Sequence, residues 1–93
     1  MSAQTESHIE TTLKNYISKT YLYDQPDFIL TNDFPLFEQR VIDSMGIFHL
    51  ISFMRDAFGI SIQHQDMILE NFGTITDISA LVNRYLQQMQ GFE

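Results

Sequence analysis

Three stretches of this sequence place apolar residues at intervals of three and four, which is the spacing of one face of an α-helix. The spacing predicts long helices over about 7–21, 44–58 and 75–89. A shorter helix is expected over 66–72, because Gly73 interrupts the pattern directly after it. We therefore expect an all-α fold, a small four-helix bundle made of three long helices and one short helix.

Residues that commonly cap helices stand at the ends of these stretches. Asp43 or Ser44 can begin the second long helix, since a short oxygen-bearing side chain accepts bonds from the free N–H groups of the first turn. Gly59 is placed to end that helix in a left-handed conformation. Thr74 or Thr76 is expected to cap the last helix.

A long connection over about 22–43 separates the first two helices. It contains Pro26 and Pro35, and a proline turns the residue before it away from helical geometry. Loops of this length are uncommon in small domains and are often functional. We expect apolar residues to hold the loop across the bundle, namely Phe28, Ile29, Leu30, Phe34, Leu36 and Phe37.

Length and charge limit the classes of partner. The 93 residues suit one domain, 1–93, and the formal net charge is −7. An acidic surface repels nucleic acid and anionic membranes and suits partners with basic docking patches, although acidity alone can also serve only solubility. The chain has no cysteine, which excludes disulfides, thiolate metal sites and a cysteine nucleophile.

No segment of the sequence reads as a membrane span or a secretion signal. The longest mostly apolar run, Met45 to Met54, is far shorter than the roughly 20 residues that cross a bilayer. The first six residues lack the basic and apolar regions of a signal peptide. We therefore expect a cytoplasmic protein, and a monomer.

Ser44 is the candidate for chemistry. It stands where a long loop becomes a helix, so its hydroxyl should be open to a visiting enzyme. A phosphate attached there would lie near free N–H groups and the positive end of the helix dipole. Taken alone, an Asp-Ser pair at a helix start is more often just a cap.

The surroundings of Ser44 add to this pattern. The run Val41-Ile42-Asp43-Ser44-Met45-Gly46 is followed by an amphipathic helix ending in Phe58-Gly59-Ile60, then by Glu70-Asn71-Phe72 and a capped last helix. This order and spacing resemble the acyl carrier and peptidyl carrier protein family over about residues 9–86.

The resemblance implies a covalent cofactor. In that family, the serine of an Asp-Ser-Leu motif receives 4′-phosphopantetheine from coenzyme A, and a magnesium-dependent phosphopantetheinyl transferase catalyses the step. The resemblance places this role on Ser44, with Asp43 orienting the motif. Met45 stands where the family usually has leucine, a similar apolar side chain, so the departure bears on affinity for a given transferase.

A carrier of this kind catalyses nothing itself. Its arm brings a thioester to successive enzymes at high local concentration, and an adenylating or acyl-loading enzyme and a downstream transferase or synthase act on it. The pathway expected is nonribosomal-peptide, polyketide or aminoacyl-transfer biosynthesis. The alternatives are a carrier of general fatty acid synthesis, or a non-catalytic helical adaptor.

The second long helix suggests where partners dock. Fatty acid synthesis carriers usually have a markedly acidic second helix, whereas this one carries only Asp56 as an acid after Ser44. We expect Met45, Phe48 and His49 to form a docking face with apolar character around the arm. The alternative for Phe48 is a place in the core.

Other combinations of residues give weaker evidence for a functional site. Five residues of helix turn through about 500°, so Ser44 and His49 lie about 140° apart and cannot form a nucleophile–base pair. Neither catalytic residues nor a metal site is expected. His64-Gln65-Asp66 reads as an exposed polar segment rather than a set of ligands. The cargo should be an amino acid or a short acyl group, because bulky residues fill the space that a long chain needs, namely Phe53, Phe58 and Phe72.

Overall fold

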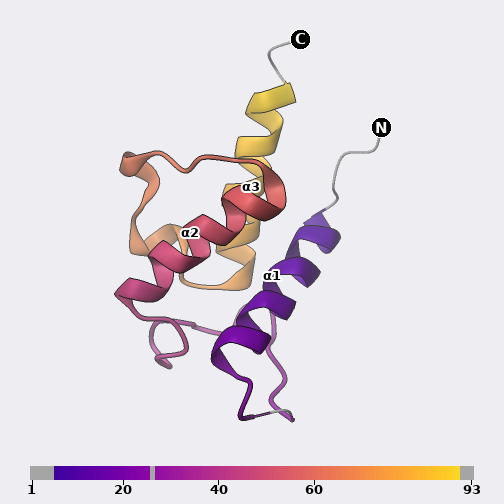
Figure 1. Cartoon of the computed structure of the whole chain (residues 1–93), viewed down its shortest axis with the longest axis vertical. Helices are drawn as coiled ribbons and strands as arrows, with labels where there is room; N and C mark the ends of the chain where they lie inside the picture. The colour runs from indigo at the N-terminus through magenta and orange to yellow at the C-terminus, as the bar shows by residue number, and fades with distance from the viewer. Residues whose placement is uncertain (1–5, 26, 91–93) are drawn as a thin grey trace.

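The computed structural model describes residues 6–25 and 27–90, and within them it contains helices and no strand. The elements, in order, are α1 (Glu6–Tyr21), α2 (Ser44–Phe58), the short 3₁₀ turns η1 (His64–Asp66) and η2 (Leu69–Asn71), and α3 (Ile75–Gln90) (Figure 1). In this described part, no helix combines the length and the apolar character needed to cross a bilayer.

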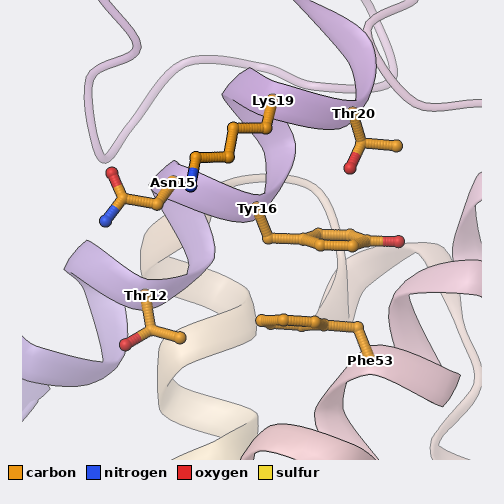
Figure 2. A pocket seen from close by; sticks show the side chains of 6 residues that line it. All are labelled: Thr12, Asn15, Tyr16, Lys19, Thr20 and Phe53. Atoms are coloured by element: carbon orange, nitrogen blue, oxygen red, sulfur yellow. The ribbon is translucent and has the colours of Figure 1, made fainter.

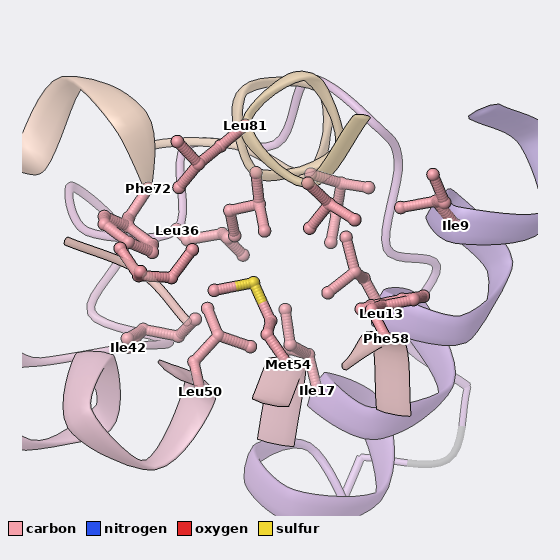
Figure 3. Packing of buried hydrophobic residues seen from close by; sticks show 14 of the residues in the cluster. Ile9, Leu13, Ile17, Leu36, Ile42, Leu50, Met54, Phe58, Phe72 and Leu81 are labelled. Carbon is pink, nitrogen blue, oxygen red and sulfur yellow. The ribbon is translucent and has the colours of Figure 1, made fainter. Parts of the chain in front are cut away.

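The three α-helices enclose one apolar core. α1 and α3 run in opposite directions and pack against each other, and α2 crosses them obliquely (Figure 1). Figure 3 shows Met54 of α2 near the centre of the buried side chains, with Leu13 and Ile17 of α1 on one side. Leu36 and Phe72 come from the two connections and are also fully buried. The core is thus completed by the loops as well as by the helices.

The short helix expected over 66–72 is not formed, and two separate 3₁₀ turns replace it. The side chain of Asn71 donates a 2.8 Å hydrogen bond to the carbonyl of Asp66, and the hydroxyl of Tyr85 donates a 2.6 Å bond to the Asp66 carboxylate. The same hydroxyl accepts a 2.9 Å bond from the Gln63 N–H. These side-chain bonds compete with the regular backbone pattern of a helix. The short fourth helix of the expected bundle is therefore not confirmed as one continuous helix.

The ends of α2 and α3 carry caps of the expected kinds. Asp43, not Ser44, caps α2, and its carboxylate accepts a 2.9 Å bond from the Gly46 N–H. Gly59 ends the helix with φ 71° and ψ 26°, the left-handed region that costs glycine little. Thr74 caps α3 by accepting a 3.1 Å bond from the Asp77 N–H. α2 therefore begins at Ser44 because the residue before it supplies the cap.

The connection over 22–43 lies across the bundle and is held by buried apolar side chains, namely Leu22, Leu30, Leu36 and Ile42. Leu36 also donates a 2.8 Å backbone bond to the carbonyl of Gly73, which ties this loop to the turn before α3. Ile29 was expected among the anchors but is 80% exposed, so that expectation is wrong for this residue. The anchored loop delivers the chain to the start of α2.

Candidate functional site

Ser44 is the first residue of α2, and its side chain is exposed. Because Asp43 makes the cap, the hydroxyl of Ser44 is not needed to satisfy the first turn. The backbone N–H groups of that turn and the positive end of the helix dipole lie beside it. The position can therefore present a nucleophilic oxygen to another protein and hold a phosphate once one is attached.

Close packing fixes the turn that carries Ser44. Gly46 is buried, and a Cβ atom added to it would lie 2.8 Å from Cγ2 of Ile42 and 3.1 Å from the hydroxyl oxygen of Tyr21. The Tyr21 hydroxyl donates a long bond, 3.5 Å, to the carbonyl of Gly46. Burial raises the pKa of Tyr21, and the neighbouring Tyr16 raises it further, so the phenol stays protonated as a donor. The last residue of α1 thus supports the first turn of α2.

A cavity of about 470 Å³ opens beside Ser44. Its lining includes Phe37, Arg40 and Asp43 from the end of the long loop. Arg40 has φ 61°, an uncommon left-handed conformation for a residue with a side chain, and it is exposed. An exposed hydroxyl, a basic side chain and an open space are what a phosphate-linked arm at Ser44 would require, so the residues present fit such a group.

The residues expected to form a docking face lie together on the first two turns of α2. Met45 is 62% exposed, Phe48 is 60% exposed, and His49 is also exposed. At 100° per residue they fall within an arc of about 100°, and Ser44 borders that arc. The alternative that placed Phe48 in the core is wrong. Two large apolar side chains held in water beside Ser44 are available to a partner.

A second cavity lies between α1 and α2 on another side of the molecule (Figure 2). It measures about 380 Å³, and the ring of Tyr16 stacks on the ring of Phe53 at its wall, with centroids 4.1 Å apart and planes at 16°. Phe53 lies nine positions after Ser44 on α2, about two and a half turns, so the two side chains leave the helix on opposite sides. This cavity therefore opens on the flank of α2 that faces away from Ser44.

The polar segment around His64 takes part in structure. Asp66 accepts the bond from Tyr85 and forms an ion pair with Arg84, with 3.5 Å between nitrogen and oxygen. Across residues 6–25 and 27–90, no three histidine or acidic side chains gather as a possible metal site. Ser44 and His49 both lie on α2, so the helix keeps them about 140° apart around its axis.

Three residues at the site were not identified from the sequence. Arg40 gave no signal, since its place beside Ser44 depends on how the loop folds. Gly46 did give a usable signal. A glycine in a helix costs about 1 kcal/mol relative to alanine, so its presence suggests that a side chain would not fit there. Tyr21 is the last residue of the helix expected over 7–21, and nothing in its spacing shows that its hydroxyl reaches the carbonyl of Gly46.

Comparison with known proteins adds an independent observation. The probable acyl carrier protein PigG of Serratia sp. (strain ATCC 39006) is 37% identical to this chain over 76 residues. The matched region covers 82% of this chain and 86% of that protein, so the similarity extends over nearly the whole fold. No protein-family model matches the chain.

Proposed function

Because the chain belongs to the acyl carrier protein family, whose members carry cargo for other enzymes and are not catalysts, we propose that it carries an acyl or aminoacyl group as a thioester on a 4′-phosphopantetheine arm attached to Ser44. Proteins of this family generally hold their cargo on such an arm. The proposal assigns the attachment to one atom, Oγ of Ser44.

The exposure of Ser44 at the start of α2 carries this proposal. Seven serines occur in the chain, and Ser52 and Ser61 are exposed as well. Ser44 differs from those two because it combines exposure with a helix N-terminus and a cavity that contains a basic side chain. Ser52 lies in the middle of α2, and Ser61 lies in an irregular segment, so neither has these features.

The chain itself supplies only the attacking hydroxyl and its surroundings in this reaction. A transferase would remove the proton from the Ser44 hydroxyl, and Oγ would form a bond to the phosphorus next to the pantetheine of coenzyme A. The bond from that phosphorus to the bridging oxygen would break, and adenosine 3′,5′-bisphosphate would leave. When bound, the arm supplies the thiol that forms the thioester, which a chain without cysteine cannot supply itself. The chain positions Oγ, and Arg40 and the α2 N-terminus would balance the phosphate charge.

We propose a dedicated biosynthetic pathway of the nonribosomal-peptide, polyketide or aminoacyl-transfer kind, located in the cytoplasm. An adenylating or acyl-loading enzyme would attach the cargo, and a transferase or synthase would take it. The near absence of acids on α2 supports this choice over general fatty acid synthesis. Phe58 and Phe72 are buried, which supports a small cargo that stays outside the core.

Mass spectrometry of the intact protein tests the attachment. The purified chain is incubated with coenzyme A, magnesium and a broad-specificity phosphopantetheinyl transferase. We expect a gain of one phosphopantetheine in the wild type and in Ser52→Ala, and no gain in Ser44→Ala. Ser52 is the matched control, since it is an exposed serine on the same helix. An unmodified wild type would favour a non-catalytic adaptor and would overturn the proposal.

We also propose that Met45, Phe48 and His49 form the docking face for these enzymes. The change Phe48→Ala removes an exposed ring, so it should slow transfer of the arm severalfold while changing the free energy of unfolding by less than about 0.5 kcal/mol. Ile29→Ala is the control, because Ile29 is exposed but lies neither on α2 nor in the lining of the cavity beside Ser44. Equal transfer rates for the two variants, or a Phe48→Ala protein that loses stability but not rate, would contradict the docking role.

A further inference from the structure

A third cavity borders the cavity beside Ser44, and Phe37 and Glu38 line both. This third cavity measures about 350 Å³ and lies between the long loop and the turn that precedes α3. Leu69, Glu70 and Gly73 form its far side. We call the two adjoining cavities the trough. Its lining includes Ser44 at one end, Phe37 and Glu38 in both cavities, and Leu69 at the other end.

Backbone hydrogen bonds hold the two walls of the trough together. The N–H of Leu36 donates to the carbonyl of Gly73 at 2.8 Å, which joins the two walls. Within the loop wall, the N–H of Val41 donates to the carbonyl of Leu36 at 2.8 Å. Leu36 itself is fully buried. A bound group would therefore meet a surface whose walls are already in place, which lowers the entropic cost of binding.

The chemical character of the trough changes along its length. Arg40 lies at the Ser44 end, where an arm would have its phosphate. The Asp43 carboxylate lies at that end too, where it caps α2. Phe37 and Glu38 line both cavities, and Leu69 and Glu70 line only the far one. The basic side chain thus lies only at the Ser44 end, and the far end has carboxylates and apolar surface without a cation. An arm that ends in an aminoacyl group has the complementary order, an anionic phosphate first and an ammonium last.

We infer that the cargo end of the arm lies in the trough, and that Glu38 and Glu70 favour an aminoacyl group, whose α-ammonium they attract, over an acyl group of the same shape. The inference rests on the proposed attachment at Ser44. The cavity between α1 and α2 is the poorer host, because it opens on the opposite flank of α2 and its lining includes Lys19 and no carboxylate. An ammonium would be repelled there.

Two arms that differ only in the ammonium test the inference. A transferase attaches pantetheine arms that end in leucyl amide or in 4-methylpentanoyl amide, which is leucyl without its amino group. Intact mass verifies that each arm is attached. Proton NMR then measures the nuclear Overhauser contacts between the methyl groups of the cargo and the side chains of Phe37 and Leu69.

We expect these contacts for the leucyl arm, with intensities roughly two- to fivefold above those of the 4-methylpentanoyl arm, the range for exposed charge pairs. The double variant Glu38→Gln, Glu70→Gln keeps the shapes of the side chains and should remove the difference. Asp24→Asn is the matched control for the loss of negative charge, because Asp24 is exposed and lines neither part of the trough. It should leave the difference intact.

Three results would overturn the inference. The first is equal contacts for both arms. The second is cargo contacts with Tyr16 and Phe53 in the cavity between α1 and α2, or with no residue of the chain. The third is a chain that accepts neither arm, which would overturn the proposed function and this inference together. A chain that accepts both arms but shows no difference between them would leave the attachment at Ser44 standing.

Discussion

The two connections of this molecule, 22–43 and 59–74, link long helices without an α-helix of their own, but they are held in different ways. The first depends on buried apolar side chains, including Leu22, Leu30 and Leu36. The second also has buried apolar residues, but its two 3₁₀ turns are fixed by hydrogen bonds that converge on Asp66. Apolar anchoring depends little on pH, whereas the bond that the Tyr85 phenol donates is lost when the phenol loses its proton.

Both connections border the trough. The first contributes Phe37 and Glu38, and the second contributes Leu69 and Glu70. Their contact at Leu36 and Gly73 joins a wall held by apolar packing to a wall held by polar bonds. Changes of pH should therefore loosen one wall of the trough before the other.

The largest effect is expected for Leu36→Ala in the first connection. Leu36 is fully buried, and its truncation leaves a cavity in the core, so we expect a loss of about 2 to 5 kcal/mol in the free energy of unfolding. Urea denaturation measures the loss. Ile29→Ala in the same connection is the control and should cost less than about 0.5 kcal/mol, because Ile29 is 80% exposed. Similar losses for the two variants would contradict apolar anchoring through Leu36.

A smaller effect is expected for Gly46→Ala, where the first connection meets α2. The new methyl group would lie 2.8 Å from Cγ2 of Ile42, a buried atom close to the backbone. Crowding of this kind costs about 1 to 3 kcal/mol, and the higher helix propensity of alanine offsets up to about 1 kcal/mol. We expect a net loss of stability by urea denaturation and a slower modification of Ser44 by the transferase. A variant more stable than the wild type would show that the turn tolerates a side chain.

Tyr85→Phe tests the polar anchoring of the second connection. The variant keeps the ring but removes the donor to Asp66 and the acceptor for the Gln63 N–H, so we expect a loss of about 1 to 2 kcal/mol. Hydrogen exchange should quicken first at the amides of the 3₁₀ turns, Asp66 and Met67, while those of α1 keep their protection. Uniform quickening across all helices would contradict a local role for Tyr85.

The pH dependence of stability follows from the same residue. Burial and the bond to Asp66 raise the pKa of Tyr85 above its ordinary value of about 10, so the folded state holds this proton more tightly than the unfolded state. The contribution of Tyr85 to the free energy of unfolding is therefore complete below about pH 10 and falls as the pH rises above it. The fall in stability above about pH 10 should be shallower in Tyr85→Phe than in the wild type. Tyr21, whose pKa is also raised, accounts for part of the fall that remains. Identical declines in both proteins would contradict this assignment.

The smallest effect is expected for Ser79→Ala. Ser79 lies on α3, outside both connections. Ser79 is fully buried, and within the described residues its hydroxyl has no hydrogen-bond partner. Removing an unsatisfied buried hydroxyl should leave the free energy of unfolding unchanged within about 0.5 kcal/mol, or raise it slightly. A loss greater than about 1 kcal/mol in urea denaturation would mean that the hydroxyl contributes a contact of its own.

The difference between the connections also explains what could be predicted from the sequence. The caps at Asp43, Gly59 and Thr74 depend on neighbouring residues, and local patterns identify such features well. The helix expected over 66–72 failed because Tyr85, nineteen positions beyond Asp66, helps to decide the local conformation. The trough could not be predicted, since its part near Leu69 lies between two connections that meet where Leu36 bonds to the carbonyl of Gly73.

The site where the arm is attached can be measured directly, because tryptic cleavage isolates Ser44 in a short peptide. Trypsin cleaves after Arg40 and Arg55, which releases a peptide, 41–55, with two serines, Ser44 and Ser52. Protein purified from the organism that makes it is digested, and tandem mass spectrometry locates the added mass. We predict one phosphopantetheine on Ser44 and an unmodified Ser52. A modification on any other residue, or a peptide that is never modified in active cells, would contradict the account.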